Sequence, residues 1–149
     1  MACERSCLKP HSNSVVCCCF LPGGDLLCTG SHDHTLCLWH VSEGWTRKLV
    51  GHTNWVTCCA FQLSGGVLAS GSADETLRLW DVDAIAAADP SERVGSEVLK
   101  EYGGAIQCCG FNRSGRILCS GSADGCVRLW SLARRACVAV LAGHRGWVT

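Results

Sequence analysis

The feature that most constrains this chain is a stretch of eleven residues that occurs three times. The copies are "GSHDHTLCLWH" at residues 30–40, "GSADETLRLWD" at residues 71–81 and "GSADGCVRLWS" at residues 121–131. Each copy places an aspartate six positions before a tryptophan. Self-similarity at a period of about 40 residues is typical of repeat architectures, in which each unit buries its apolar face against its neighbours.

Other positions keep the same register. His11 and His52 each lie 22 residues before the aspartate of their unit, and Tyr102 holds that position before Asp124. The segment "GHRGWVT" at residues 143–149 matches "GHTNWVT" at residues 51–57 and starts a further unit. We therefore divide the chain into residues 1–10 (outer strand of a preceding unit), 11–50 (repeat 1), 51–100 (repeat 2, with an inserted loop at 83–96), 101–142 (repeat 3) and 143–149 (truncated start of repeat 4).

Each unit contains four short segments typical of β-strands. In the second unit these are "VTCCAF", "GVLASGS", "TLRLW" and "SEVLK", and turn residues such as Ser64-Gly65-Gly66 separate them. The inserted loop, "DAIAAADPSERVG", allows a helical turn that stops before Pro90. We interpret it as a surface loop, and leave open a docking loop or a phosphorylation site at Ser91.

The pattern resembles the WD-repeat β-propeller family. The residues that carry the resemblance are Gly51-His52, Ser70 to Asp74 and Leu79 to Asp81, with partial matches in the other units. The resemblance implies an all-β fold in which blades of four antiparallel strands surround a channel. Propellers typically have four to eight blades, so we expect a partial propeller of about three blades plus the start of a fourth. The open edges of such a partial propeller would expose unpaired strand groups and favour association with other chains.

A set of Ser, His and Asp in one unit also suggests a nucleophile with its base. Two adjacent units carry such a set, however, and an enzyme rarely needs two copies of one triad. The resemblance instead implies a hydrogen-bonded chain in each blade, which satisfies buried polar groups. The residues of this structural network are His11, Thr29, Asp33, Trp39, His52, Ser70, Asp74, Trp80, Tyr102, Ser120, Asp124 and Trp130. We expect no catalytic residues and no enzyme activity.

The chain contains 14 cysteines, but its start has no apolar segment typical of a secretory signal. We therefore expect a reducing compartment, cytoplasmic or nuclear. Cysteine recurs at equivalent positions, such as Cys17, Cys58 and Cys108, where small apolar residues belong. Neighbouring cysteines on one strand point to opposite faces, and no pair of CxxC motifs has zinc-finger spacing. We expect core packing, no metal and no cofactor, with Cys3 and Cys7 as the more reactive thiols.

Charge and hydropathy restrict the partners. Lys plus Arg and Asp plus Glu are both 13, which gives a net charge of +0, so we expect no nucleic-acid binding. No apolar run approaches the roughly 20 residues that cross a bilayer, and we expect no membrane association and no small-molecule substrate. A protein or peptide partner with apolar anchors fits this composition best.

The resemblance places the partner-binding face at the loops that enter each first strand and at the turns before each third strand. The candidate residues are Asn13, His32, Asn54, Trp55 and Trp147. Exposed tryptophans are common binding hot spots, although packing on a neighbouring blade is the alternative for both Trp55 and Trp147. We predict a non-catalytic interaction scaffold. The alternative is a substrate-receptor or regulatory domain of a larger enzyme assembly, such as a ubiquitin ligase.

The third unit departs from the pattern, because Tyr102 replaces histidine and Glu101 replaces glycine. We predict that this blade is the least rigid of the three. In hydrogen exchange, the amides of residues 126–130 should exchange faster than those of residues 76–80. Equal or greater protection at residues 126–130 would contradict the prediction.

Overall fold

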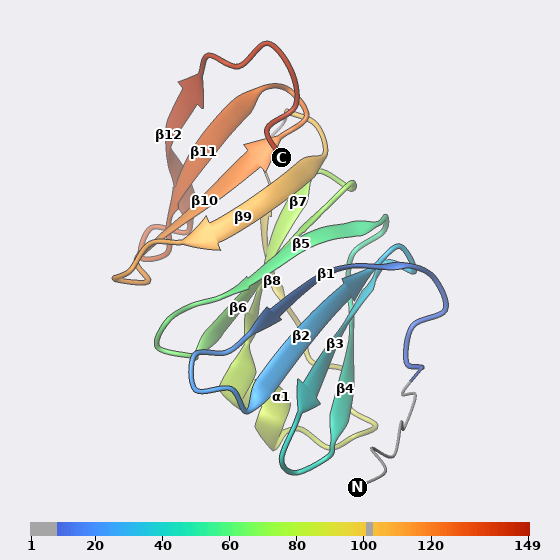
Figure 1. Ribbon diagram of the computed structural model, residues 1–149. Coiled ribbons are helices and arrows are strands. Elements are labelled where there is room, and N and C mark those ends of the chain that lie inside the picture. Colours follow the sequence, from blue (N-terminus) through green and yellow to red (C-terminus); the bar gives the residue numbers. More distant parts are fainter. Residues whose placement is uncertain (1–8, 101–102) are drawn as a thin grey trace, which may run out of the picture.

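The computed structural model describes residues 9–100 and 103–149, which form three four-stranded antiparallel sheets, one from each sequence repeat (Figure 1). Blade 1 contains β1 (Val15–Phe20), β2 (Leu26–Ser31), β3 (Thr35–His40) and β4 (Thr46–Val50). Blade 2 contains β5 (Val56–Phe61), β6 (Val67–Ser72), β7 (Thr76–Asp81) and β8 (Glu97–Lys100). Blade 3 contains β9 (Ile106–Phe111), β10 (Ile117–Ser122), β11 (Cys126–Ser131) and β12 (Ala136–Ala142). The all-β, partial-propeller fold expected from the sequence is confirmed.

Within each blade the strands follow one another in chain order, and short turns join them except between β7 and β8, where the inserted segment lies. The first and second strands of all three blades are joined by the same turn, in which a glycine N–H donates to a carbonyl three residues earlier. In blade 2, Gly65 donates to Gln62 at 2.9 Å and has a φ of 85°. Glycine suits this position because L-residues with a side chain rarely adopt positive φ. The repeated turn explains why the strand pattern recurs so regularly.

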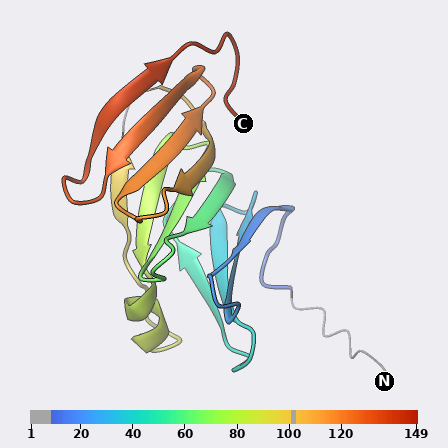
Figure 2. The same cartoon turned by 60° about the vertical axis from the view of Figure 1, so that its left-hand side comes forward.

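The blades pack face to face, with β1, β5 and β9 at one edge of the stack (Figures 1 and 2). One apolar core fills the junction of blades 1 and 2 and includes Leu36, Leu38, Leu68 and Trp80. A second core fills the junction of blades 2 and 3. Because each core draws side chains from two sheets, a blade buries its apolar face only when its neighbour is present.

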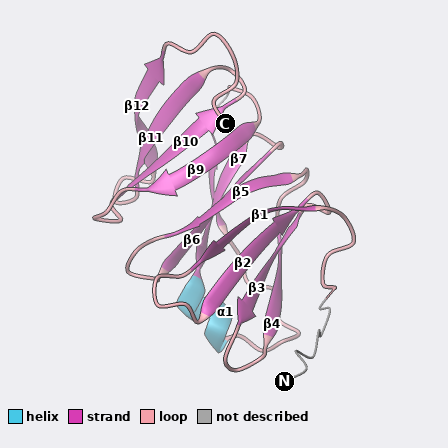
Figure 3. Cartoon of the chain, in the orientation of Figure 1, coloured by secondary structure: helices cyan, strands magenta, loops and turns pink. Residues whose placement is uncertain are grey.

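The inserted segment of repeat 2 begins with a short helix, α1 (Val82–Ala87), which is the only helix in the described part of the chain (Figure 3). Asp81 caps it by accepting a hydrogen bond from the Ala84 N–H at 2.9 Å. Val82 and Ile85 are buried in the core between blades 1 and 2. The first turns of the insertion therefore belong to the core, whereas most residues between Asp89 and Gly95 are exposed.

The face of β1 that points away from blade 2 is open. Val16 and Phe20 lie on it and are 44% and 59% exposed. Cys17 and Cys19 point the other way and pack against the core between blades 1 and 2. The outer strand expected within residues 1–10 falls mainly on residues 1–8, which lie outside the described residues.

The blade junctions require small residues on the second strand. A Cβ atom on Gly71 would lie 2.5 Å from Cγ2 of Ile106 and 2.6 Å from Sγ of Cys58, which is too close for either. We predict that Gly71→Ala lowers the free energy of unfolding by about 1–3 kcal/mol, because the junction of blades 2 and 3 must open to admit it. Chemical denaturation measures the change.

The matched control is Gly66→Ala, at the start of the same hairpin, where a Cβ atom would meet nothing within 4 Å. This variant should stay within about 0.5 kcal/mol of the wild type. Equal effects of the two substitutions would show that the close contact at Gly71 does not limit the packing of the blades.

Candidate functional site

Blade 2 contains a continuous chain of side-chain hydrogen bonds. Trp80 on β7 donates its Nε1–H to Oγ of Ser70 on β6 at 2.9 Å. Oγ of Ser70 lies 2.8 Å from Nε2 of His52, and Nδ1 of His52 lies 2.9 Å from Oδ2 of Asp74. A carboxylate only accepts, so Nδ1 carries the proton, and in the neutral imidazole Nε2 then accepts the serine hydroxyl proton. Each polar group in the chain thus has a partner.

Asp74 is the most heavily bonded member of this chain. It accepts from the Thr53 N–H at 3.0 Å, from the Thr76 N–H at 2.9 Å and from the Thr76 hydroxyl at 2.6 Å, besides His52. Burial by itself raises the pKa of Asp74, but the hydrogen bonds from His52, Thr76 and the Thr53 backbone outweigh it and hold the pKa well below its usual range. The carboxylate is therefore ionised at neutral pH and fixes the loop before β5.

Blade 1 repeats this geometry with threonine in place of serine. Trp39 donates to Oγ1 of Thr29 at 3.0 Å, and Nε2 of His11 lies 2.9 Å from the same oxygen. Nδ1 of His11 lies 3.0 Å from Asp33, which also accepts from the Ser12 N–H at 2.9 Å. The structure therefore brings together the eight predicted network residues of the first two blades in two equivalent sets.

Blade 3 uses a different partner for its aspartate. Arg128 on β11 donates to both carboxylate oxygens of Asp124, at 3.2 Å and 2.6 Å, and its hydrogen bonds lower the pKa of Asp124 to about 2. A Cβ atom on Gly103 would collide with both side chains, so glycine leaves room for the ion pair. Trp130 still donates to Ser120 at 2.9 Å. Tyr102 lies outside the described residues.

Arg128 was missed in the sequence analysis. Its spacing of four residues from Asp124 does not by itself predict contact, because Asp124 lies in the turn between β10 and β11 whereas Arg128 lies on β11. The signal that could have found it is the combination of a lost histidine at position 102 with an arginine two residues before the repeated tryptophan.

The burial of these sets argues against nucleophilic catalysis. Ser70 is 0% exposed, and the side chain of His52 is also 0% exposed. A serine nucleophile must reach its substrate, whereas Oγ of Ser70 is occupied by Trp80 on one side and His52 on the other. The Ser–His–Asp arrangement ties the second and third strands to the loop before the first strand.

The predicted binding residues lie at the blade edge where the loops enter the first strands. His32 in blade 1 and Trp55 in blade 2 stack on each other, with ring centroids 4.3 Å apart and planes inclined by 20°. Trp55 remains 50% exposed in this stack. Asn13 and Asn54 are exposed, and each accepts a hydrogen bond from the next backbone N–H, at 2.7 Å and 2.8 Å.

Trp147 is 69% exposed and lies beside blade 3. The segment that carries it is held by the Val148 N–H, which donates to the carbonyl of Ser122 at 3.1 Å. The structure therefore joins His32 and Trp55 across one blade junction and places Trp147 at the far side of blade 3.

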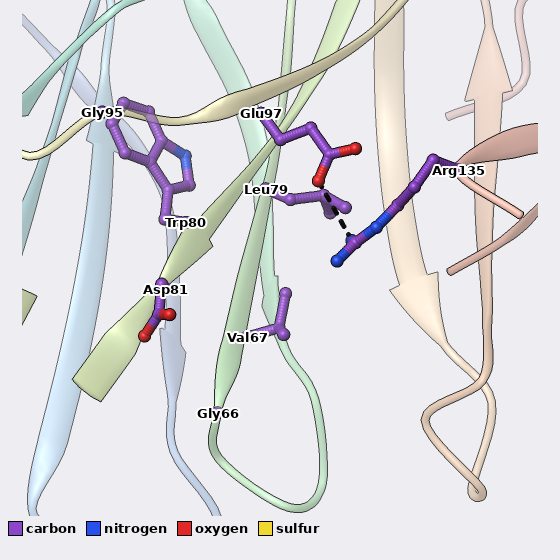
Figure 4. A pocket seen from close by; sticks show the side chains of 8 residues that line it. All are labelled: Gly66, Val67, Leu79, Trp80, Asp81, Gly95, Glu97 and Arg135. Atoms are coloured by element: carbon purple, nitrogen blue, oxygen red, sulfur yellow. Dashed lines mark ion pairs between the residues drawn. The ribbon is translucent and has the colours of Figure 1, made fainter. Parts of the chain in front are cut away.

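A pocket elsewhere on the molecule lies between blade 2 and the β11–β12 turn (Figure 4). Arg135 of that turn forms an ion pair with Glu97 of β8 at 3.2 Å, and Trp80 and Leu79 form part of the wall. Its volume is about 240 Å³. Pockets for small molecules usually enclose roughly 300–1,000 Å³, so we assign no ligand to this one.

Comparison with known proteins identifies the family. The family model described as "WD domain, G-beta repeat" (WD40) matches residues 2–40, 45–81 and 96–131. These stretches cover more than half of the chain, and the chain therefore belongs to the WD40 repeat family. No curated protein matches the chain by sequence.

Two solved structures show the same fold. The chain is similar to the structure of U3-55K (TM-score 0.84, 23% identity, 95% of this chain and 43% of that chain). It is also similar to the crystal structure of RRP9 WD40 repeats (TM-score 0.84, 24% identity, 95% of this chain and 42% of that chain). The chain thus spans less than half the length of these two chains. At such identities the likeness concerns the fold alone. Among the described residues, no helix is long and apolar enough to cross a membrane.

The hydrogen-bonded aspartates predict a specific dependence of stability on pH. The pKa of Asp74 is lowered in the folded state, so its contribution is present above the unfolded value of about 3.9 and is lost as the pH falls towards the folded value. We predict that Asp74→Asn loses about 1–3 kcal/mol at pH 7. Below about pH 4 its unfolding free energy should fall less steeply than that of the wild type.

Urea denaturation at a series of pH values measures both effects. The control is Asp25→Asn, an exposed carboxylate in the β1–β2 turn, which should follow the wild-type curve. If the unfolding free energies of wild type and Asp74→Asn had the same pH dependence, the hydrogen bonds to Asp74 would not stabilise its ionised form.

Proposed function

We propose that this chain is part of a non-catalytic scaffold that binds a protein or peptide at the blade edge carrying His32 and Trp55. The observation that carries the proposal is the stack of these two rings across the junction of blades 1 and 2. The equivalent positions at the next junction are Ala73 and Ala105, so the fold does not need aromatic rings there. An aromatic pair that the next junction lacks, and that is half open to solvent, is typical of a recognition surface.

The chemistry of this edge favours an uncharged partner segment. Trp55 offers a large apolar surface that is already ordered by its stack with His32, which reduces the entropy lost on binding. The neighbouring Asn13 and Asn54 supply polar groups at the rim. None of the five candidate residues is an arginine or a lysine, so an acidic or phosphorylated segment has no counter-charge among them. A peptide with an apolar or aromatic anchor fits best.

The cysteines support a reducing compartment for this scaffold. Twelve free cysteines are distributed through the described residues, and several, including Cys28 and Cys37, are buried as free thiols. Proteins that keep so many thiols reduced are usually found in the cytoplasm or the nucleus. We infer one of these two locations.

The test is a selection from a library of neutral peptides, with aromatic residues allowed at one position, against the wild-type chain. We predict that Trp55→Ala weakens the binding of the selected peptides by at least tenfold, because a tryptophan hot spot contributes about 2 kcal/mol or more. Isothermal titration calorimetry measures the dissociation constants, and circular dichroism verifies the fold.

Leu63→Ala is the matched control. Leu63 is 54% exposed on the same blade but lies in the β5–β6 turn, at the opposite end of the strands. This variant should bind the peptides as the wild type does. Unchanged binding by a folded Trp55→Ala variant would refute the proposed site.

A further inference from the structure

Three cysteine thiols from three different strands meet at the junction of blades 1 and 2. Cys19 on β1 lies directly opposite Cys28 on β2, and Cys59 on β5 reaches them from the neighbouring blade. The three sulfur atoms all lie within 4.8 Å of one another, and Sγ of Cys19 is 3.3 Å from Sγ of Cys59. The spacing of cysteines along one strand does not reveal this cluster, because its members come from three strands.

The packing of the fold does not require three thiols at this place. Repeat 2 has Ala60 and Ala69 at the positions of Cys19 and Cys28, and the two alanines form the same cross-strand pair. At the junction of blades 2 and 3, Cys109, the counterpart of Cys59, interacts with the thiol of Cys58, but alanines replace the counterparts of Cys19 and Cys28. Among the described residues, only the junction of blades 1 and 2 gathers three such ligand atoms.

The surroundings suit a bound ion. Cys28 is 0% exposed, and apolar residues such as Leu26, Val56 and Phe61 belong to the core around the cluster. Cys19 and Cys59 are only partly buried, which leaves a route from solvent. A site of this kind shields the ion from water and still permits its entry.

Thiolate sulfur is a soft ligand that selects Cu(I) and Zn(II) over harder ions. Metal–sulfur bonds are about 2.3 Å long, which places three sulfurs around one ion roughly 4 Å apart. Sulfur atoms already within 4.8 Å of one another need only small side-chain movements to reach that arrangement. Binding replaces the thiol protons, so up to three protons leave as the ion enters.

We propose that Cys19, Cys28 and Cys59 form a binding site for a thiophilic metal ion, Cu(I) or Zn(II), that links blade 1 to blade 2. The ion joins β1 and β2 to β5 and stabilises the junction by mass action, since the unfolded chain lacks the arrangement. This site is independent of the proposed peptide-binding edge, because none of its residues belongs to that edge.

The experiment titrates the reduced chain, under anaerobic conditions, with Cu(I) in one series and with Zn(II) in another. The double variant Cys19→Ala/Cys28→Ala installs the alanine pair that repeat 2 already carries. The control is Cys119→Ala, which removes the exposed counterpart of Cys28 in blade 3. Equilibrium dialysis with metal analysis gives the stoichiometry, and thermal melting gives the stabilisation.

We expect wild type and Cys119→Ala to bind one equivalent of at least one of the two ions and to melt at a higher temperature with it. The double variant should bind at least tenfold more weakly and should not gain stability. The two series show which ion is preferred. Failure of both ions to bind, or equal binding by the double variant, would overturn the proposal.

Alkylation of the wild-type chain gives a second readout that does not depend on the folding of a variant. The bound ion should protect Cys19 and Cys59 from iodoacetamide, as measured by mass spectrometry, whereas the exposed Cys18 should react as before. Equal labelling of Cys19 and Cys59 with and without the metal would also overturn the proposal.

Discussion

The structure depends on a hydrogen-bond acceptor for one tryptophan N–H in each blade, partly buried in blade 1 and buried in blades 2 and 3. Trp80 uses the hydroxyl of Ser70, and that hydroxyl in turn satisfies His52, which is oriented by Asp74. The chain of bonds therefore runs from the third strand through the second strand to the loop before the first strand. Loss of one member leaves its neighbours without a hydrogen-bond partner. Each unpaired buried polar group then costs about 1–3 kcal/mol of stability.

The same bonds position the proposed binding edge. Asp74 accepts from the backbone of Thr53, and Ser72 donates to the carbonyl of Asn54 at 3.2 Å. Trp55 follows directly, and its own N–H donates to the side chain of Asn54. The exposed ring is thus attached to a loop whose backbone is held from the interior. The buried network and the open surface are two ends of one rigid arrangement.

The repeat spacing was sufficient to predict the strands and the three blades, and the resemblance to the WD-repeat family implied the eight residues that the structure joins in the first two blades. The pairing of Arg128 with Asp124 was not predictable in this way, because it depends on the conformation of a turn. The cluster of Cys19, Cys28 and Cys59 depends on which strand faces which across a blade junction, and spacing within one unit carries no such information. The burial of Ile85 likewise depends on contacts that alanine-rich composition does not specify.

The stack of His32 on Trp55 joins two repeats that form the same four-stranded blade. Neither repeat contains the pair by itself, since His32 belongs to the first unit and Trp55 to the second. Exchanging or reordering the units would preserve every blade and yet separate the two rings. The order of the repeats therefore determines whether the aromatic pair forms. A duplication that copied one unit alone would reproduce the blades without this pair.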